Sequence, residues 1–173
     1  MERGDRYVLW PAAFVDGVFS VPDETLASLW REIVATGKHR SLFYNGGVTD
    51  EVGWIDWIKS PANYPVLVVD SVAGNVVAVG WLNNTLDGAA LVHFCVFGWP
   101  HPEIGRVVLR YWSSVGILKV LVGFTPETNI AAIKYAEKLG FKRSGYIPLM
   151  CNMAYEGRRV GAIVTTYITQ QEA

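Results

Sequence analysis

The stretch that most constrains this chain runs from Gly88 to Pro148, where two apolar strands alternate with two amphipathic helices. An apolar strand over Ala89–Gly98 leads through Trp99-Pro-His-Pro102 into the first helix, and a second strand over Lys119–Phe124 leads into the other helix. A strand–helix–strand connection within one sheet is a right-handed parallel crossover. The stretch therefore predicts two parallel strands, with a ligand gap over the start of the first helix.

The two helices are indicated by apolar periodicity and by the residues at their ends. Pro102 suits a first helical position, and Gly116 ends the first helix. Gly140 is expected to adopt a left-handed conformation that ends the second helix. The apolar positions of the first helix are Ile104, Val107, Val108, Tyr111, Trp112 and Val115, and those of the second are Ala132, Tyr135, Ala136 and Leu139.

The remaining segments predict a mixed sheet with helices on both faces, which is an α/β (α+β) fold. Residues Lys38–Gly47 show no period. Asp50 can cap a short helix whose Val52, Ile55 and Ile58 face inward. The other expected elements are a broken strand over Tyr7–Phe19, a helix between Pro22 and Gly37, an antiparallel meander of Val66–Val69, Val76–Leu82 and Leu91–Phe97, and strands over Phe141–Ile147 and Val160–Ile168.

Composition sets broad limits on the fold and on the partners. With 173 residues the chain is expected to form a single domain over 1–173. An apolar share of 51% is ample for one sizeable core. Fifteen basic and sixteen acidic residues leave a net charge of −1. This balance argues against a nucleic-acid partner, because such proteins carry a basic excess or a basic stripe.

The cysteines and the apolar segments predict a compartment. Cys95 and Cys151 match neither a disulfide framework nor a metal-site spacing, so we expect no metal and a reducing cytoplasm. The charged opening Met1–Arg6 is not followed by the apolar run of a secretory signal. The most apolar stretch, Val66–Leu82, holds a charged residue and a turn signal, so it predicts two strands and not a span of ~20 apolar residues. We therefore expect a soluble protein with no membrane partner.

Three short motifs carry a family resemblance. Asn129-Ile-Ala-Ala132 opens the second helix of the central stretch, and Lys138-Leu-Gly-Phe141 and Ser144-Gly145-Tyr146 follow it. With this element order, the motifs resemble the GNAT acyltransferase superfamily over most of the chain, and in overall style the chain is similar to small GNAT-like proteins of bacteriophages and prophages. The resemblance implies a GNAT-like fold in which the two central strands splay apart, with acetyl-CoA bound in the gap as co-substrate.

The resemblance also implies where the co-substrate would bind. Pantetheine would pair with free backbone groups of the strand ending at Cys95-Val96-Phe97, and Asn129 would lie near the pantetheine arm. The pyrophosphate would bind N–H groups at the start of the next helix, around Gly105, where orphan donors and the helix dipole favour an anion. A small-molecule or peptide amine would approach from the N-terminal half and attack the thioester directly, without an acyl-enzyme.

The phosphate loop departs from the family pattern. Aligned by the helix that follows, the usual loop has its last glycine at Gly105, its first glycine at Glu103 and its Gln or Arg at Pro100. The Glu103 carboxylate would repel a pyrophosphate, and Pro102 removes one donor N–H. Arg106 is the candidate cation that would compensate by facing the phosphate.

Tyr135 and His93 are the candidate catalytic residues. Many family members have a Tyr that protonates the departing thiolate at the position of Ala136, and Tyr135 stands one place earlier, rotated by about 100°. The period of Tyr135 also fits, and favours, a core or cofactor-packing role. His93 alternates with Cys95 and Phe97 on one strand face and titrates near neutral pH, so it could accept the amine proton. The alternative is a hydrogen-bonded core histidine.

Other singled-out residues also have structural alternatives. Asn129 suits a helix N-cap as well as a pantetheine contact, and Cys95 fits a small core residue better than a nucleophile. The aromatic residues Trp54, Trp57, Trp81 and Tyr64 fit an acceptor pocket or, with more support, an ordinary core.

Three functional hypotheses follow. The first is an N-acetyltransferase that moves acetyl from acetyl-CoA to a primary amine. The second is a GNAT-like binding or assembly protein that has lost acyl transfer, because Pro100, Glu103 and Ala136 stand where the chemistry requires other residues. The third is an aromatic-rich module that forms a homodimer.

Overall fold

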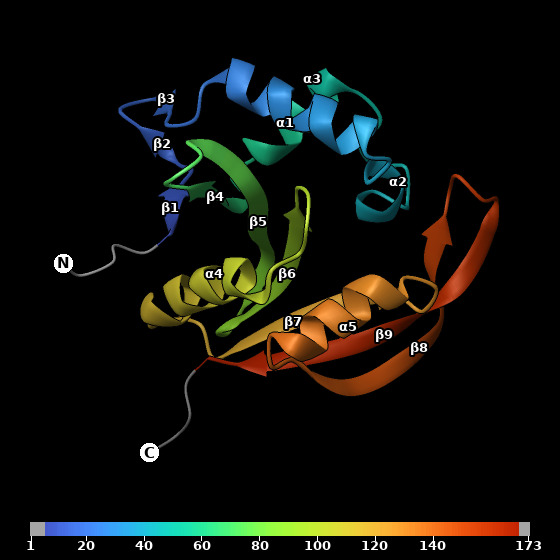
Figure 1. Ribbon diagram of the computed structural model, residues 1–173. Coiled ribbons are helices and arrows are strands. Elements are labelled where there is room, and N and C mark those ends of the chain that lie inside the picture. The colour runs from blue at the N-terminus through green and yellow to red at the C-terminus, as the bar shows by residue number, and fades with distance from the viewer. Residues whose placement is uncertain (1–5, 170–173) are drawn as a thin grey trace.

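Within residues 6–169, which the computed structural model describes, seven strands form one mixed sheet (Figure 1). The strands are β1 (Tyr7–Pro11), β4 (Tyr64–Asp70), β5 (Asn75–Leu86), β6 (Ala89–Val96), β7 (Val120–Pro126), β8 (Lys142–Met153) and β9 (Arg158–Ile168). Their order across the sheet is β1-β4-β5-β6-β7-β9-β8. The antiparallel run β4–β5–β6 is the predicted meander, and β6–β7 is the predicted parallel crossover.

Helices cover both faces of the sheet, as the sequence predicted (Figure 1). In the described range they are α1 (Asp23–Ala35), α2 (His39–Leu42), α3 (Glu51–Ile58), α4 (Pro102–Ser114) and α5 (Ile130–Lys138). Successive strand residues point to opposite faces. Leu67 of β4 accordingly packs with residues of α1 and α3, whereas its neighbours Val66 and Val68 pack with residues of α4. The sheet therefore has an α1–α3 face and an α4–α5 face.

The α1–α3 face is filled by aromatic side chains. Trp54 of α3 is fully buried, and its Nε1 donates a hydrogen bond to the Leu26 carbonyl of α1 at 2.9 Å. Trp57 lies edge-on to Trp81 of β5, with ring centroids 4.9 Å apart. The predicted inward position of Val52 is wrong, because its side chain is 70% exposed. The two tryptophans set the buried side of α3 and turn Val52 toward solvent.

Several boundaries differ from the sequence prediction. The short helix α2 lies in the segment Lys38–Gly47, where a four-residue polar helix leaves no apolar period to detect. Strand β8 was expected to end at Ile147 but continues to Met153. The intervening residues bulge out of the ladder, with Leu149 at a φ of 54°, and pairing with β9 resumes at Cys151. A further hairpin of β2 (Phe14–Val15) and β3 (Val18–Phe19) accounts for the break in the opening strand.

Strands β6 and β7 splay apart, which confirms the predicted central feature of the sheet. In the described structure their pairing covers Ala89–Leu91 against Val120–Val122. Beyond these residues β7 continues to pair with β9 as far as Pro126. The remaining part of β6, from Val92 to Val96, faces an opening on its β7 side.

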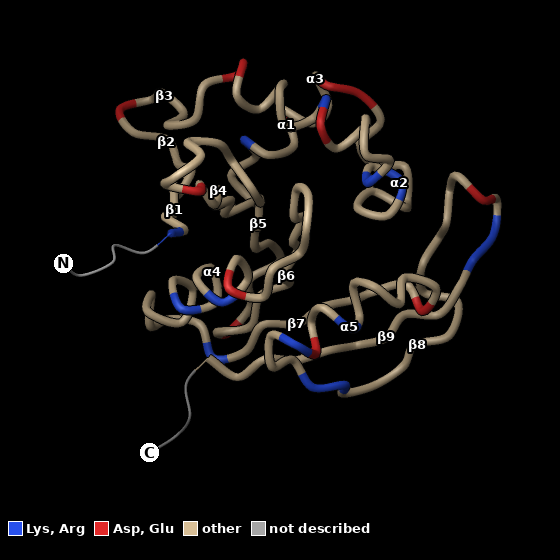
Figure 2. Tube along the Cα trace, in the orientation of Figure 1, with Lys and Arg blue, Asp and Glu red and all other residues tan. Residues whose placement is uncertain are grey.

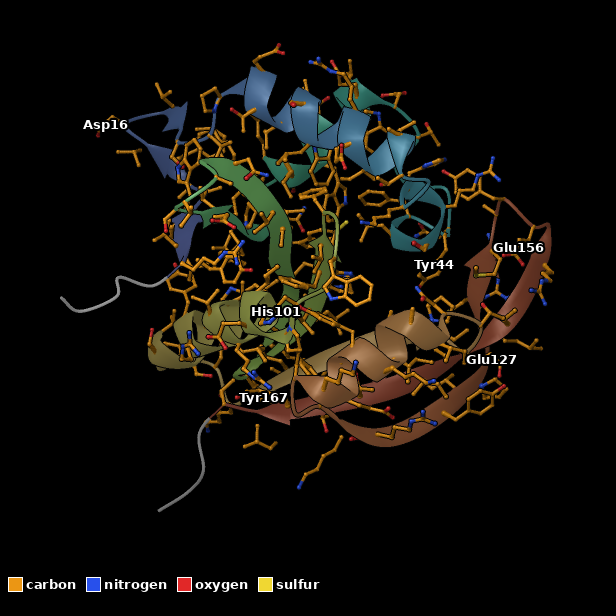
Figure 3. The ribbon with its side chains drawn as sticks, viewed as in Figure 1. Asp16, Tyr44, His101, Glu127, Glu156 and Tyr167 are labelled. Carbon is orange, nitrogen blue, oxygen red and sulfur yellow. The ribbon has the colours of Figure 1, made fainter. Side chains whose placement is uncertain are left out.

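The tip of the β8–β9 hairpin contacts the segment around α2, beyond the point where the two strands diverge. The N–H of Ala154 donates to the carbonyl of Tyr44 at 2.7 Å. The Tyr155 ring lies edge-on to His39, with centroids 5.7 Å apart. Figure 3 shows Tyr44 below α2, facing the hairpin that carries Glu156. This contact joins the two diverging halves of the sheet.

Candidate functional site

A cavity of about 360 Å³ lies where β6 and β7 diverge. Its walls are mainly apolar. On the α1–α3 face it is lined by Lys38, Ser41 and Leu42, at the start of and within α2. On the α4–α5 face it is lined by side chains such as Val108 of α4 and Ala136 of α5. The cavity therefore passes through the sheet from one face to the other, at the point where the ladder is open.

The backbone of Val96 faces this cavity. The N–H of Phe97 donates to the carbonyl of Val77 on β5 at 2.7 Å. In an antiparallel pair the residues that bond to the partner alternate along the strand. The polar backbone groups of Phe94 and Val96 therefore point away from β5, into the opening. Because buried backbone groups require partners, these groups can pair with an extended ligand that lies along β6, although the Val96 carbonyl already accepts a hydrogen bond from Lys38 Nζ.

The predicted strand contact at Cys95-Val96-Phe97 therefore separates into different roles. Cys95 lines the cavity with Val96, but Phe97 lies outside it. Cys95 is 6% exposed, and burial raises the pKa of its thiol to about 11. A thiol that stays protonated at neutral pH is a poor nucleophile. Cys95 is accordingly a small core residue, as the sequence favoured, and it also forms part of the cavity wall.

The start of α4 lies beside the cavity, but residues of the same segment already accept some of its backbone N–H groups. His101 caps the helix, and its Nδ1 accepts a hydrogen bond from the N–H of Glu103 at 3.3 Å. The His101 carbonyl accepts the N–H of Ile104 at 3.1 Å. Pro102 has no N–H to offer. Fewer donors therefore remain for an anion than at an uncapped helix start.

The Glu103 carboxylate is bound within its own helix. It pairs with Arg110 at 2.8 Å and with Arg106 at 3.6 Å. The hydrogen bond from Arg110 lowers the pKa of Glu103, so the carboxylate is charged near neutral pH. Arg106 lies outside the cavity wall and is engaged with Glu103. The role of Arg106 as a phosphate-facing cation stays a prediction, and it requires that Arg106 turn away from Glu103.

Gly105 lies on the cavity wall where α4 crosses α5. A Cβ atom placed there would come within 2.5 Å of Leu139 Cδ1 and 3.1 Å of the Tyr135 hydroxyl. The absence of a side chain at this position thus allows the two helices to approach each other. This packing accounts for the glycine whether or not a phosphate approaches it.

Tyr135 and Asn129, at α5, line the cavity. The Tyr135 ring is parallel to Phe94 of β6, with centroids 6.1 Å apart, and its hydroxyl donates to the carbonyl of His101 at 3.1 Å. Figure 3 shows His101 where the start of α4 approaches α5. Burial raises the pKa of Tyr135 to about 12. Asn129 caps α5 by accepting the N–H of Ala132 at 3.2 Å, and it also lines the cavity.

His93 lies away from the cavity, on the α1–α3 face. Its ring stacks on Trp81 with centroids 5.1 Å apart, and its Nε2 is 3.2 Å from Asn83 Oδ1. Burial lowers the pKa of His93 to about 4. A neutral imidazole of such low basicity, outside the cavity wall, is a weak candidate for the base. Its position is that of the hydrogen-bonded core histidine that the sequence left open.

The structure thus brings Cys95, Val96, Gly105, Asn129 and Tyr135 together around one cavity, and it leaves His93, Phe97 and Arg106 outside the wall. It also adds a residue that the sequence prediction missed. Lys38 lines the cavity, and its Nζ donates to the Val96 carbonyl at 2.6 Å. A single lysine in a polar segment without a period gave no signal for this role.

The aromatic residues proposed as an acceptor pocket belong mainly to the core. Trp54 and Trp81 are at most 1% exposed and contact each other, and Trp57 packs against both. Tyr64 is 55% exposed and lines a separate groove near the end of α4. None of these four side chains contributes to the wall of the cavity described above.

The distribution of charged and metal-binding side chains says little about which ligand the protein binds. Figure 2 shows acidic and basic residues interspersed along the described chain. Among residues 6–169 no cluster of three or more His, Cys, Asp or Glu side chains is arranged to hold a metal ion. In the same range no helix is long and apolar enough to cross a membrane.

The structure resembles solved acetyltransferases. The ribosomal-protein-S5-alanine acetyltransferase from Vibrio fischeri superposes with a TM-score of 0.69 at 13% identity, covering 98% of this chain and 96% of that chain. The spermidine N-acetyltransferase from Vibrio cholerae, in complex with CoA and spermine, gives 0.71 at 13% identity, with 95% and 96% covered. YncA, a putative acetyltransferase from Salmonella typhimurium with acetyl-CoA, gives 0.69 at 13% identity, with 98% and 97% covered.

These comparisons establish the fold. The chain has the GNAT fold, with its mixed sheet and flanking helices. No model of a known protein family matches the sequence, and no curated protein sequence matches it. Since identities near 13% reveal only a shared fold, the function of this chain has to be argued from its own site.

Proposed function

We propose that this protein is an acetyl-CoA-dependent N-acetyltransferase. The observation that carries the proposal is the cavity that passes through the sheet beside the open edge of β6. An extended ligand arm that contains amides can pair with such an edge as an added strand would. The solved neighbours support the proposal, because YncA is bound to acetyl-CoA and the spermidine acetyltransferase is bound to CoA.

The pantetheine arm would lie along Phe94 and Val96, with apolar contacts to Tyr135 and Ala136. Asn129 would contact the arm while it caps α5. The pyrophosphate would meet the start of α4, on the α4–α5 face. A helix start stabilises an anion by ~0.3–1 kcal/mol at exposed sites, and the Glu103 carboxylate opposes this effect. Most of the affinity is therefore expected to come from the arm.

The reaction would be a direct transfer. The neutral amine nitrogen attacks the thioester carbonyl carbon, the C–N bond forms and the C–S bond breaks. The nitrogen loses one proton to solvent, and the thiolate takes up a proton. Tyr135 is the candidate donor of that proton, but its hydroxyl must first leave the His101 carbonyl. The base role of His93 gains no support from its position. Holding both reactants in place can supply much of the acceleration without a dedicated base.

Two measurements test this function. Titration calorimetry with acetyl-CoA and with CoA tests binding, and detection of free thiol in the presence of a panel of amines tests turnover. We expect saturable binding and amine-dependent thiol release. Absence of binding at millimolar acetyl-CoA would remove the proposal.

The alternative is a GNAT-like binding or assembly protein without acyl transfer. The ion pairs of Glu103 at the phosphate end and the engaged hydroxyl of Tyr135 favour it. Binding of acetyl-CoA without thiol release, for any amine of the panel, would select this alternative.

The acceptor is proposed at the level of its class, a primary amine of a small molecule or a peptide. The neighbour that binds spermine supports a small-molecule amine. The similarity to phage proteins, the cytoplasmic location, the homodimer and the absence of a nucleic-acid partner stay predictions from the sequence.

A further inference from the structure

Lys38 places an amine inside the cavity. It lies on the turn between α1 and α2, its side chain is half-buried, and its Nζ donates to the Val96 carbonyl at 2.6 Å. Among the residues that the structure describes, it is the one charged residue of the cavity wall. The other wall residues are apolar side chains, glycines and neutral polar groups such as Ser41 and Asn129.

The position of Lys38 within the cavity sets what it can reach. The start of α4, where phosphates would bind, opens on the α4–α5 face, whereas Lys38 comes from the α1–α3 face. A ligand arm that starts at α4 would pass Val96 first, with its acyl end farther along the open edge of β6, beside Phe94. Lys38 reaches this edge from the opposite face, at Val96, and we expect its flexible side chain to extend to a thioester held beside Phe94.

We propose that Lys38 is an acyl acceptor, so that the protein acetylates this residue in its own cavity. The inference rests on the proposed function, because it needs bound acetyl-CoA. The Lys38 ammonium first loses one proton to solvent. The neutral ε-amine then attacks the thioester carbonyl carbon, a C–N bond forms and the C–S bond breaks. The amine proton passes to the leaving thiolate, so the products are N-acetyl-lysine and CoA.

The modification changes the cavity in two ways. The amide N–H can still donate to the Val96 carbonyl, but the positive charge is lost. The acetyl group also adds volume at the end of the cavity where the next acyl group would arrive. Each chain is therefore expected to take up one acetyl group at this site and then to bind acetyl-CoA more weakly.

Cys95 is the competing nucleophile within the cavity. Its thiol is buried and keeps its proton near neutral pH, whereas thiolate is the reactive form. Acetylation of Cys95 would yield a thioester that hydroxylamine cleaves, and acetylation of Lys38 would yield an amide that resists it. The two products are thus separable by a simple chemical treatment.

The test incubates the full chain with acetyl-CoA alone and follows intact mass and peptide maps over time. Lys134, Lys138 and Lys142 are exposed and report uncatalysed acetylation in the same sample. Positioning raises effective concentration by several orders of magnitude, so we expect Lys38 to react at least about tenfold faster than these lysines. Lys38→Arg keeps a cation that can bond Val96 but should abolish the modification, whereas Lys134→Arg should leave it unchanged.

Acetyl-CoA binding is measured in parallel, so that the two proposals can fail separately. Saturable binding with an unmodified Lys38 overturns the acceptor role and leaves the proposed function intact. Acetylation of Lys38 at the rate of the exposed lysines, or acetylation of Cys95 in its place, also overturns it. Absence of binding overturns both proposals. If Lys38→Arg fails to fold, the peptide map of the natural protein still decides the outcome.

Discussion

Replacing Gly105 by alanine separates helix packing from ligand binding at this position. The added Cβ would lie 2.5 Å from Cδ1 and 2.7 Å from Cδ2 of Leu139. It would also lie 3.1 Å from the Tyr135 hydroxyl. Either the Leu139 side chain turns away or α4 moves off α5, and both changes reach the cavity wall because Leu139 is part of it.

Two effects of opposite sign determine the size of the change. Alanine is favoured over glycine within a helix by ~1 kcal/mol, whereas overpacking costs ~1–3 kcal/mol. We therefore expect Gly105→Ala to lower the free energy of unfolding by about 0–2 kcal/mol. In a Leu139→Ala background most of the clash is gone, so the same substitution should be neutral or stabilise by up to about 1 kcal/mol.

Urea denaturation of the four proteins in this cycle measures the effect. Gly53→Ala in α3 is the matched control, because the closest atom to its added Cβ is Asp50 Oδ1 at 3.3 Å. Without a severe clash it should be neutral or stabilise by up to about 1 kcal/mol. An equal effect of Gly105→Ala in both backgrounds would refute the packing argument. Acetyl-CoA affinity that falls equally in both backgrounds would instead assign Gly105 to the ligand.

The other predictions concern charge and protonation. Glu103→Gln should release Arg106 and Arg110 for contact with the phosphates. Calorimetry should then show up to about fivefold tighter acetyl-CoA binding, which corresponds to ~1 kcal/mol for exposed ion pairs, and a smaller gain at high salt. An unchanged affinity would mean that the phosphates bind elsewhere. Tyr135→Phe loses the hydrogen bond to His101, which should lower the free energy of unfolding, measured in urea, by ~0.5–1.5 kcal/mol. If Tyr135 also donates the proton to the thiolate, the substitution should in addition slow thiol release at saturating acetyl-CoA. The pKa of His93 is about 4 in the folded protein, against an ordinary value of 6.5. The unfolded chain therefore takes up a proton first as pH falls below about 6.5, and stability should fall from there toward pH 4, by up to about 3 kcal/mol. If His93→Gln loses the same amount of stability between pH 6.5 and pH 4, the loss does not come from protonation of His93.

The element order was readable from the sequence because its signals are local. Apolar periodicity located α1, α4 and α5, and Gly140, at a φ of 98°, ends α5 as expected. The turn signals separated the strands of the meander. Helix α2 and the continuation of β8 were missed because one lacks a period and the other resumes after a bulge that begins at Pro148. Both depend on contacts between distant segments.

The candidate site was readable only in part. Alternation correctly placed His93, Cys95 and Phe97 on one strand face, but it does not say which neighbours cover that face. The structure shows that the Trp81 ring stacks on His93. Which residue of β6 turns its backbone to the opening depends on the register with β5, and the contribution of Lys38 depends on how α2 docks. Neither the register of β6 with β5 nor the docking of α2 can be predicted from the local sequence pattern.

Glu103 stabilises the start of α4 by its own negative charge, at the place where the proposed function would put a phosphate. Its carboxylate lies in the first turn of α4, where the helix dipole favours negative charge by ~0.3–1 kcal/mol. Arg106 and Arg110, which could meet a phosphate, are held by that same carboxylate. Each exposed ion pair contributes only ~0–1 kcal/mol, so a bound nucleotide could displace Glu103 at small cost. The new pairs of its phosphates with Arg106 and Arg110 would be of similar strength, so the net gain in binding free energy would be small. The apolar cavity and the open edge of β6 carry no such internal substitute apart from the Lys38 ammonium. If the proposed function holds, we therefore expect selectivity for the ligand to come mainly from contacts of its arm with the cavity and with β6, and less from its phosphates.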